Sequence, residues 1–409
     1  MSAELIKNLL ILFTVSIAIF RVILNELDIR SSATALIGKP DEATTKAVAY
    51  VKTKHRFETS TLIIQAIVTT TFLVLGLFGQ IHAFVAERVD GEIWQNLVFL
   101  LAIALGLYVL GLPATIYSTF VIEAKYGFNR TTVGTFIVDR IKGIVIGAVI
   151  AVPVIPLLLW IYDLIPSQLW WIAFIVLTVV QLILLAIGTT VLLPLFNKLQ
   201  VLPEGELRTK IEKLCADQNY KLKRIFVMDG SKRSSKTNAF FGGLGKSKTI
   251  VLFDSLIEKH TVDEVVGVLG HEMGHDRLGH IKTMFLTSLI QTFIIFAIFG
   301  WAVQEPALTE ALGGTGTELV LSLIAFGMLF SPLNFIIGAI DNSMSRRNEH
   351  GSDIFAAKIY GAEHIIAALK RLGVDNLANP KPHPLYVAVY YSHPPVSQRI
   401  AHVEKLVKA

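Results

Sequence analysis

Long uncharged stretches alternate with charged ones along this chain. A bilayer core about 30 Å thick needs roughly 20 apolar residues in a helix, and six stretches of that length contain no Asp, Glu, Lys or Arg. They are residues 59–86, 96–122, 143–162, 167–196, 283–304 and 319–340. The pattern predicts six membrane-spanning helices.

A seventh span is predicted at the N-terminus. Residues 8–20 are apolar, Arg21 interrupts them, and Val22, Ile23 and Leu24 complete the length. We expect the Arg21 side chain to snorkel toward an interface. A cleaved signal peptide is the alternative, but the segment before the apolar run has a single Lys7 and no small-residue cleavage site directly follows the run.

The composition fits a membrane protein. Hydrophobic residues make up 53% of the chain and charged residues 17%, which argues against a soluble or disordered protein. Its single cysteine, Cys215, excludes a disulfide scaffold. The net charge is +5, but the basic residues are concentrated in particular loops rather than on one face of the molecule. We therefore predict no nucleic-acid partner.

The basic residues predict an orientation. Residues 27–58, 123–142, 197–282 and 341–409 carry 34 of the 37 Lys and Arg residues. Loops rich in Lys and Arg stay in the cytoplasm. Seven spans then place the N-terminus outside and the C-terminus in the cytoplasm.

Four regions follow from this division. Residues 1–196 hold spans one to five, and residues 283–340 hold spans six and seven. Between and after them, residues 197–282 and 341–409 are the large polar segments where a water-soluble structure can form. We therefore predict a mainly α protein, a seven-helix membrane bundle with a small cytoplasmic α+β domain built from two segments.

The first polar segment shows periods typical of helices and strands. It predicts helices at 206–215 and 262–278 and strands at 224–229 and 249–254, with the residues 238–241 between the strands completing a small antiparallel meander. Thr261 and Glu264 have the spacing of a capping box at the start of the second helix.

One glycine-rich segment has a superficial likeness to a phosphate-binding loop. Gly245-Lys246-Ser247 would need a glycine at Phe240 and a buried strand before it, and has neither. We predict no nucleotide partner.

The strongest chemical signal is His271-Glu272-Met273-Gly274-His275 in the predicted helix. Residues i and i+4 share one face of a helix, so both imidazoles can bind one Zn²⁺ while Glu272 reaches a water on the metal. A surface helix that happens to carry two histidines is the alternative interpretation.

A catalytic zinc site needs a third protein ligand. His280 is half a turn out of phase if the helix continues, so it would face away from the metal. In the second polar segment, Glu349 and His350 are further candidates, and Glu349 and Asp353 have i, i+4 spacing on a predicted helix at 346–358. One carboxylate can bind the metal while the other supports it.

Both halves of this candidate site adjoin predicted spans. His275 stands eight residues before Thr283, and Glu349 stands nine residues after Ile340. At 1.5 Å per residue each lies roughly 12–14 Å along a helix from its span. Continuous helices would therefore place the metal at the cytoplasmic mouth of the bundle.

Several motifs in this order resemble the type I CAAX prenyl proteases, which are integral-membrane zinc metalloproteases, and indicate a bacterial relative of them. The resemblance covers nearly the whole chain. It rests on residues 125–132, 231–239, 251–254, 271–275, 345–349 and 392–395, together with Arg399.

This resemblance implies a role for each matching residue. His271, His275 and Glu349 would bind one Zn²⁺ per chain, and Glu272 would be the general base. His393 would steady the oxyanion, and Asp353 and Arg399 would support the metal ligands. Asn238 and Ala239 would lie on an edge strand that pairs with an extended substrate. The seven helices would enclose a chamber.

The function we expect is that of a membrane-embedded zinc endopeptidase acting near the cytoplasmic face, in CAAX-type C-terminal processing or in membrane-protein quality control. Its partners would be the lipid bilayer and a peptide or protein substrate, prenylated or membrane-associated. The bacterial inner membrane and the endoplasmic reticulum are both candidate locations. The alternative is a membrane transporter or scaffold with a structural zinc site, but six predicted spans lack the ionisable residues that transport requires.

Overall fold

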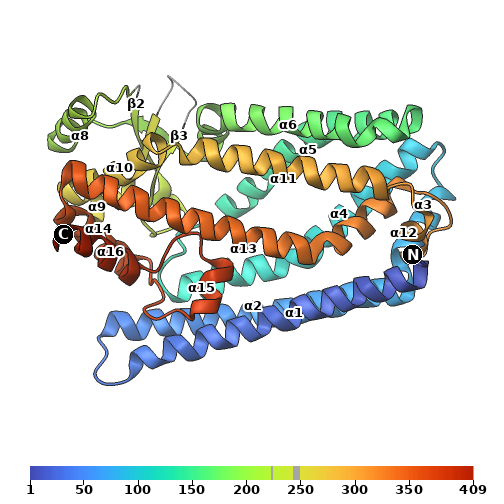
Figure 1. The fold of residues 1–409 in the computed structure, drawn as a ribbon, viewed down its shortest axis with the longest axis horizontal. Coiled ribbons are helices and arrows are strands. Elements are labelled where there is room, and N and C mark those ends of the chain that lie inside the picture. Colours follow the sequence, from blue (N-terminus) through green and yellow to red (C-terminus); the bar gives the residue numbers. More distant parts are fainter. Residues whose placement is uncertain (223, 243–248, 409) are drawn as a thin grey trace.

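The long helices run side by side along the long axis of the molecule, and the sheet lies among shorter helices near one end (Figure 1). This computed structural model describes residues 1–222, 224–242 and 249–408. Within them, seven helices are long and apolar enough to cross a membrane, as predicted. They are α1 (Ala3–Ala33), α2 (Glu42–Leu75), α4 (Glu92–Tyr117), α5 (Val133–Leu164), α6 (Leu169–Ile187), α11 (His280–Ala302) and α13 (Leu319–Tyr360).

The second and fifth predicted spans contain breaks. Gly76 adopts a left-handed conformation with φ of 63° and separates α2 from α3 (Leu77–Ala86). Glycine accepts this conformation without the steric cost that a Cβ would bring. The fifth span ends in a π-helical turn at Gly188–Leu192 followed by α7 (Leu193–Phe196).

Arg21 has a polar partner within the protein. Its Nε donates to the Tyr390 hydroxyl at 3.1 Å, and Tyr390 ends the short helix α15 (Pro384–Tyr390). A residue 369 positions away thus supplies a polar contact for Arg21, and its position at an interface stays a prediction.

A four-stranded sheet forms in the first polar segment. Its strands are β1 (Leu199–Val201), β2 (Arg224–Met228), β3 (Ala239–Gly242) and β4 (Thr249–Phe253), in the order β1-β2-β4-β3. The predicted antiparallel meander was wrong, since β2 and β4 pair in parallel. The chain between them includes β3, and a long connection of this kind permits parallel pairing where a tight hairpin would not. Gly243 and the Gly245-Lys246-Ser247 segment lie outside the described residues.

Two helices cover one face of this sheet, α8 (Glu206–Asp217) and α10 (Val262–Arg277). Their shared core consists of aliphatic side chains, among them Ile211, Leu214, Ile225, Ile250, Leu252, Val266 and Leu269. The remaining short helices are α9 (Asp254–Lys259), α12 (Pro306–Ala311), α14 (Ala362–Asp375) and α16 (Val396–Lys408). The core holds α10 rigidly against the sheet.

Glycines let α10 approach α13 closely. A Cβ added to Gly274 would lie 2.9 Å from the Cα of Ser352, and one added to Gly270 would lie 3.5 Å from the Cα of Ala356. A Cβ at Gly274 would force the two helices apart, whereas one at Gly270 would make an ordinary van der Waals contact. Gly274 therefore fixes the distance between the helix that carries His271 and the helix that carries Glu349.

We expect Gly274→Ala to destabilise the protein by about 1–3 kcal/mol, the cost of overpacking a close contact, even though alanine favours helix by about 1 kcal/mol. The matched control is Gly338→Ala on α13, because a Cβ there meets nothing within 4 Å. Thermal unfolding of the two variants checks this prediction. Equal midpoints for the two variants would show that the α10–α13 contact can absorb a methyl group.

Candidate active site

The start of α10 is fixed by a capping box, as predicted. The Thr261 hydroxyl accepts from the Glu264 backbone N–H at 3.3 Å, and the Glu264 carboxylate accepts from the Thr261 N–H at 2.9 Å. The helix then runs unbroken through His271 and His275. Their side chains therefore share one face, one turn apart.

Glu349 comes from the continuation of a membrane helix. The helix α13 has 42 residues, about twice the number that spans a bilayer core. At 1.5 Å per residue, Glu349 lies roughly 45 Å from its start. The predicted helix at 346–358 is therefore the last part of one long helix, and Glu349 lies farther from the start of that helix than the thickness of a bilayer core.

Three side chains predicted as metal ligands converge. One nitrogen each from His271 and His275 and one oxygen from Glu349 all lie within 4.8 Å of one another. The Nε2 atoms of His271 and His275 are 3.1 Å apart, and each lies within 3.4 Å of a Glu349 carboxylate oxygen. His271 and Glu349 are buried, whereas His275 is partly exposed.

Asp353 and Arg399 contact the candidate ligands His271 and Glu349. Asp353 Oδ1 lies 2.8 Å from His271 Nδ1, which fixes the ring with its other nitrogen toward Glu349. Arg399, on α16, donates to both oxygens of Asp353 at 2.6 and 2.8 Å, and its Nη1 lies 3.4 Å from Glu349 Oε2. The structure thus brings both predicted supporting residues into contact with the candidate ligands.

His280 lies beside the site and does not face away from it. Gly279 takes a left-handed conformation with φ of 75° and ends the helical course between α10 and α11. His280 Nδ1 is therefore 3.2 Å from His275 Nδ1 and 3.4 Å from the Ser352 hydroxyl. The expectation assumed that the helix continues from α10 into the membrane span α11. The structure instead has two helices, which are separated at Gly279.

The loop that carries His393 is anchored on both sides. Arg346, on α13, donates to the carbonyls of Val387 and Tyr391 at 3.0 and 2.6 Å. On the opposite side the buried Asp28 of α1 accepts from the His383 N–H at 2.7 Å. His393 Nε2 then lies 3.2 Å from Glu349 Oε1, with most of its side chain exposed.

Sequence reasoning assigned no role to Arg346 or Asp28. Arg346 stands in the motif at residues 345–349, so its proximity to Glu349 was a usable signal. Asp28 gave no signal for this role, because its contacts with Asn379 and His383 join residues more than 350 positions apart.

The charges at the site suit a cation. Burial raises the pKa of Glu272 above its usual range. For His271, burial lowers the pKa, but hydrogen bonds to Asp353 and Glu349 more than offset this and raise it to about 9. A metal ion bound to His271 would compete with a proton for the same nitrogen.

The residues present fit a metal ion. Glu349 Oε2 is buried and, among the described residues, makes no hydrogen bond, although His271 Nε2 and Arg399 Nη1 each lie 3.4 Å from it. Its lone pairs are therefore available to a bound cation. Two imidazoles and one carboxylate form the donor set of a catalytic zinc site with one open position.

The predicted substrate-binding residues Asn238 and Ala239 lie at a strand that contacts α10. Ala239 begins β3, the last strand in the sheet order, and β3 contacts α10. The carbonyl of Asn238 accepts from the Phe253 N–H at 3.1 Å, while its side chain is exposed. An edge strand therefore runs beside the helix that carries His271 and His275.

Known protein families match both halves of this chain. The family described as CAAX prenyl protease N-terminal, five membrane helices, matches residues 34–198. Residues 202–407, which contain every candidate ligand, match peptidase family M48. The chain belongs to peptidase family M48.

Similar proteins support the assignment of this M48 peptidase. A CAAX prenyl protease 1 homolog of Oryza sativa subsp. japonica is 36% identical over 331 residues, which covers 80% of this chain and 77% of that protein. A homolog of Homo sapiens is 35% identical and covers 79% and 76%. The crystal structure of S. mikatae Ste24p has a TM-score of 0.91 at 30% identity and covers 98% and 99% of the two chains.

These matches confirm the predicted family, fold class and enzyme class. This M48 peptidase is a multi-pass membrane protein and a zinc endopeptidase. They do not favour a transporter or a scaffold with a structural zinc site.

Proposed function

We propose that one zinc ion per chain is held by His271, His275 and Glu349, and that the protein cleaves prenylated or membrane-associated substrates at the cytoplasmic face of the membrane. The observation that carries this proposal is the convergence of the three ligand atoms within 4.8 Å. Glu349 brings that site beyond the hydrocarbon core on a helix that also crosses it.

The protein's own groups then perform the proton transfers. Bound zinc supplies Lewis acidity and lowers the pKa of water toward neutrality. Glu272 takes a proton from the attacking water and delivers it to the leaving amine. His393, exposed and anchored by its loop, donates to the oxyanion that develops on the scissile carbonyl. Asp353 and Arg399 hold His271 and Glu349 in place.

The substrate binds in an extended conformation along β3. Only one side of this strand pairs within the described sheet, through β4. Its free edge offers backbone groups for strand addition from the Asn238–Ala239 end. A peptide bound there runs past α10 and places a carbonyl group at the site.

The orientation follows from the charges. With 34 of 37 Lys and Arg residues in four segments, the C-terminus and the site lie in the cytoplasm and the N-terminus lies outside. The seven membrane helices enclose a chamber that presents the prenyl group or a membrane-bound segment. The host membrane is the bacterial inner membrane or the endoplasmic reticulum.

Two peptides of one sequence test the substrate. We expect the purified protein to cleave a peptide with a farnesylated C-terminal CAAX cysteine after that cysteine, and at least about tenfold faster than the same peptide without farnesyl. A zinc chelator should abolish cleavage and added Zn²⁺ should restore it. Sequencing of the products by mass spectrometry locates the bond. Equal rates on both peptides would contradict prenyl recognition and favour quality control of membrane proteins.

A further inference from the structure

A basic cavity lies where the membrane helices meet the sheet, away from the candidate metal ligands. It has a volume of about 830 Å³ and is lined by Lys142 of α5, by the π-helical turn at Gly188–Leu192 and α7, by β1, by β2 and the turn that follows it, and by the start of β4. Its charged lining residues are Lys142, Lys198, Arg224, Lys232 and Asp229. Four cations against one carboxylate suit an anion.

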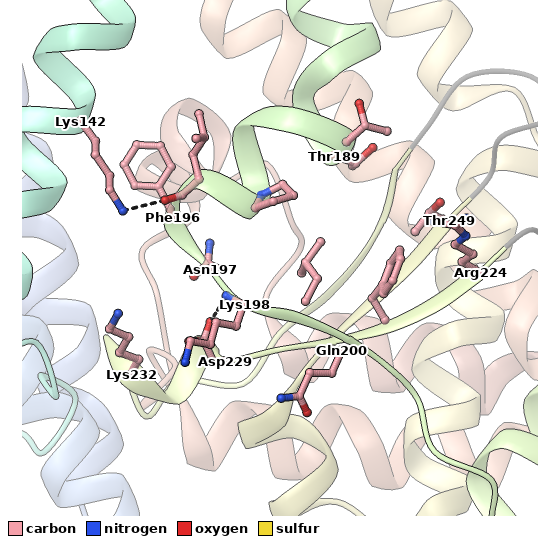
Figure 2. Close-up of a pocket in the computed structure, with 15 residues that line it drawn as sticks. Lys142, Thr189, Phe196, Asn197, Lys198, Gln200, Arg224, Asp229, Lys232 and Thr249 are labelled. Atoms are coloured by element: carbon pink, nitrogen blue, oxygen red, sulfur yellow. Dashed lines mark hydrogen bonds between the residues drawn. The ribbon is translucent and has the colours of Figure 1, made fainter.

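The cations are spread around the cavity rather than paired within it. Lys142, Lys198 and Lys232 lie on one side of it, and Arg224 lies across from them (Figure 2). The side chains of Lys198, Lys232 and Arg224 belong to exposed residues. Lys142 Nζ donates to the carbonyl of Leu195 at 2.7 Å, which uses one of its three donors.

The cavity wall is held by a fixed set of hydrogen bonds. Arg233 donates to both oxygens of Asp139 on α5 at 2.7 and 2.9 Å, to the Asn197 side chain at 2.9 Å and to the Phe196 carbonyl at 2.7 Å. One guanidinium thus joins α5 to the end of α7. The part of the cavity wall formed by Phe196 and Asn197 is therefore in place before a ligand arrives, which lowers the entropic cost of binding.

The position of the cavity identifies the source of the anion. It lies where the uncharged stretch at 167–196 ends and Lys198 begins the charged segment. Leu195 lines the cavity and is exposed, as are Ile141 and Val191, which adjoin the lining residues Lys142 and Thr190 in the chain. A membrane lipid places its phosphate at this level and its acyl chains along such side chains, whereas a soluble phosphate gains nothing from them.

We infer that this cavity binds the headgroup of an anionic phospholipid through Lys142, Lys198 and Lys232. The lipid phosphate lies among the three ammonium groups, and its acyl chains follow the exposed apolar residues of α5 and α7. Such a lipid would join the membrane helices to the sheet that carries the edge strand β3.

Native mass spectrometry of the purified full chain tests the inference. We expect retention of palmitoyl-oleoyl phosphatidylglycerol but not of phosphatidylcholine with the same acyl chains. Each basic residue near an anionic lipid surface contributes roughly a fivefold factor, so K142Q/K198Q/K232Q should weaken binding about a hundredfold. The control K213Q/K221Q/K405Q removes three lysines of exposed residues elsewhere and should bind like the unchanged protein.

A variant that binds the lipid more tightly tests the inference without the risk that misfolding explains the result. Asp229 is the acidic residue of the lining, and its Oδ1 accepts from the Lys198 backbone N–H at 2.7 Å, a bond that asparagine can keep. Asp229→Asn should strengthen phosphatidylglycerol binding roughly fivefold. Unchanged binding by both the triple variant and Asp229→Asn would overturn the inference. So would displacement of the lipid by glycerol 3-phosphate at equal concentration, since that would indicate a site for soluble phosphate.

Discussion

Glu272→Ala should abolish peptide cleavage while leaving the metal bound. Glu272 follows His271 directly and adds no ligand atom to the set formed by His271, His275 and Glu349. A general base contributes a factor of roughly 10²–10⁴ to the rate, so we expect kcat to fall by at least about a hundredfold with metal content unchanged. Cleavage kinetics and elemental analysis of the same sample measure both quantities.

Two further variants sharpen this test. Glu272→Gln keeps the shape of the side chain but cannot accept a proton, so it should be as inactive as alanine. Glu258→Gln makes the same change at an exposed residue of α9 and should retain full activity. If Glu272→Ala cleaved at the unchanged rate in a preparation free of other proteases, another group would be the base.

Most of the architecture was predictable because membrane constraints are strict. A span needs a long uncharged run, so six helices were evident from the sequence and the seventh required only that Arg21 find a partner. The capping box at Thr261 and Glu264 and the period of α10 were also local features. Predictions of this kind depend on residues a few positions apart, and the structure confirms them.

The features that were mispredicted depend on contacts between distant segments or on a single backbone angle. The parallel pairing of β2 with β4 depends on a connection of some 20 residues, which periodicity does not reveal. His280 lies beside His275 because Gly279 alone interrupts the helical course. Asp28 holds the loop of His393 across most of the chain length.

The candidate ligands also divide into those that local sequence predicts and one that depends on contacts between distant segments. His271 and His275 follow from the period of one helix, whereas the residues alone left Glu349, His350 and His280 as candidates for the third position. Packing brings Glu349 to the histidines, since Gly274 lets α13 approach α10 closely enough for Glu349 to reach them. Only the resemblance to a known family made Glu349 the preferred residue before the structure was available.

Glu349→Ala should remove the metal itself, in contrast to Glu272→Ala. Loss of an outer partner of a metal ligand lowers affinity about 10–100-fold, and loss of one of three direct ligands should cost more. We therefore expect the zinc content to fall from about one per chain to near zero after dialysis against metal-free buffer. The exposed Glu404 on α16 provides the matched control, and Glu404→Ala should keep its metal.

Thermal unfolding with and without Zn²⁺ distinguishes loss of metal binding from loss of folding stability. Glu349 is buried beside Arg399, so its removal could also weaken the contact between α13 and α16. A ligand that binds only the folded protein raises its stability by RT ln(1 + [L]/Kd). Added Zn²⁺ should therefore raise the unfolding temperature of the unchanged protein and of Glu404→Ala but leave that of Glu349→Ala where it was. A full zinc-dependent rise in Glu349→Ala would assign the third ligand to another residue, and His280, 3.2 Å from His275, would be the next to test.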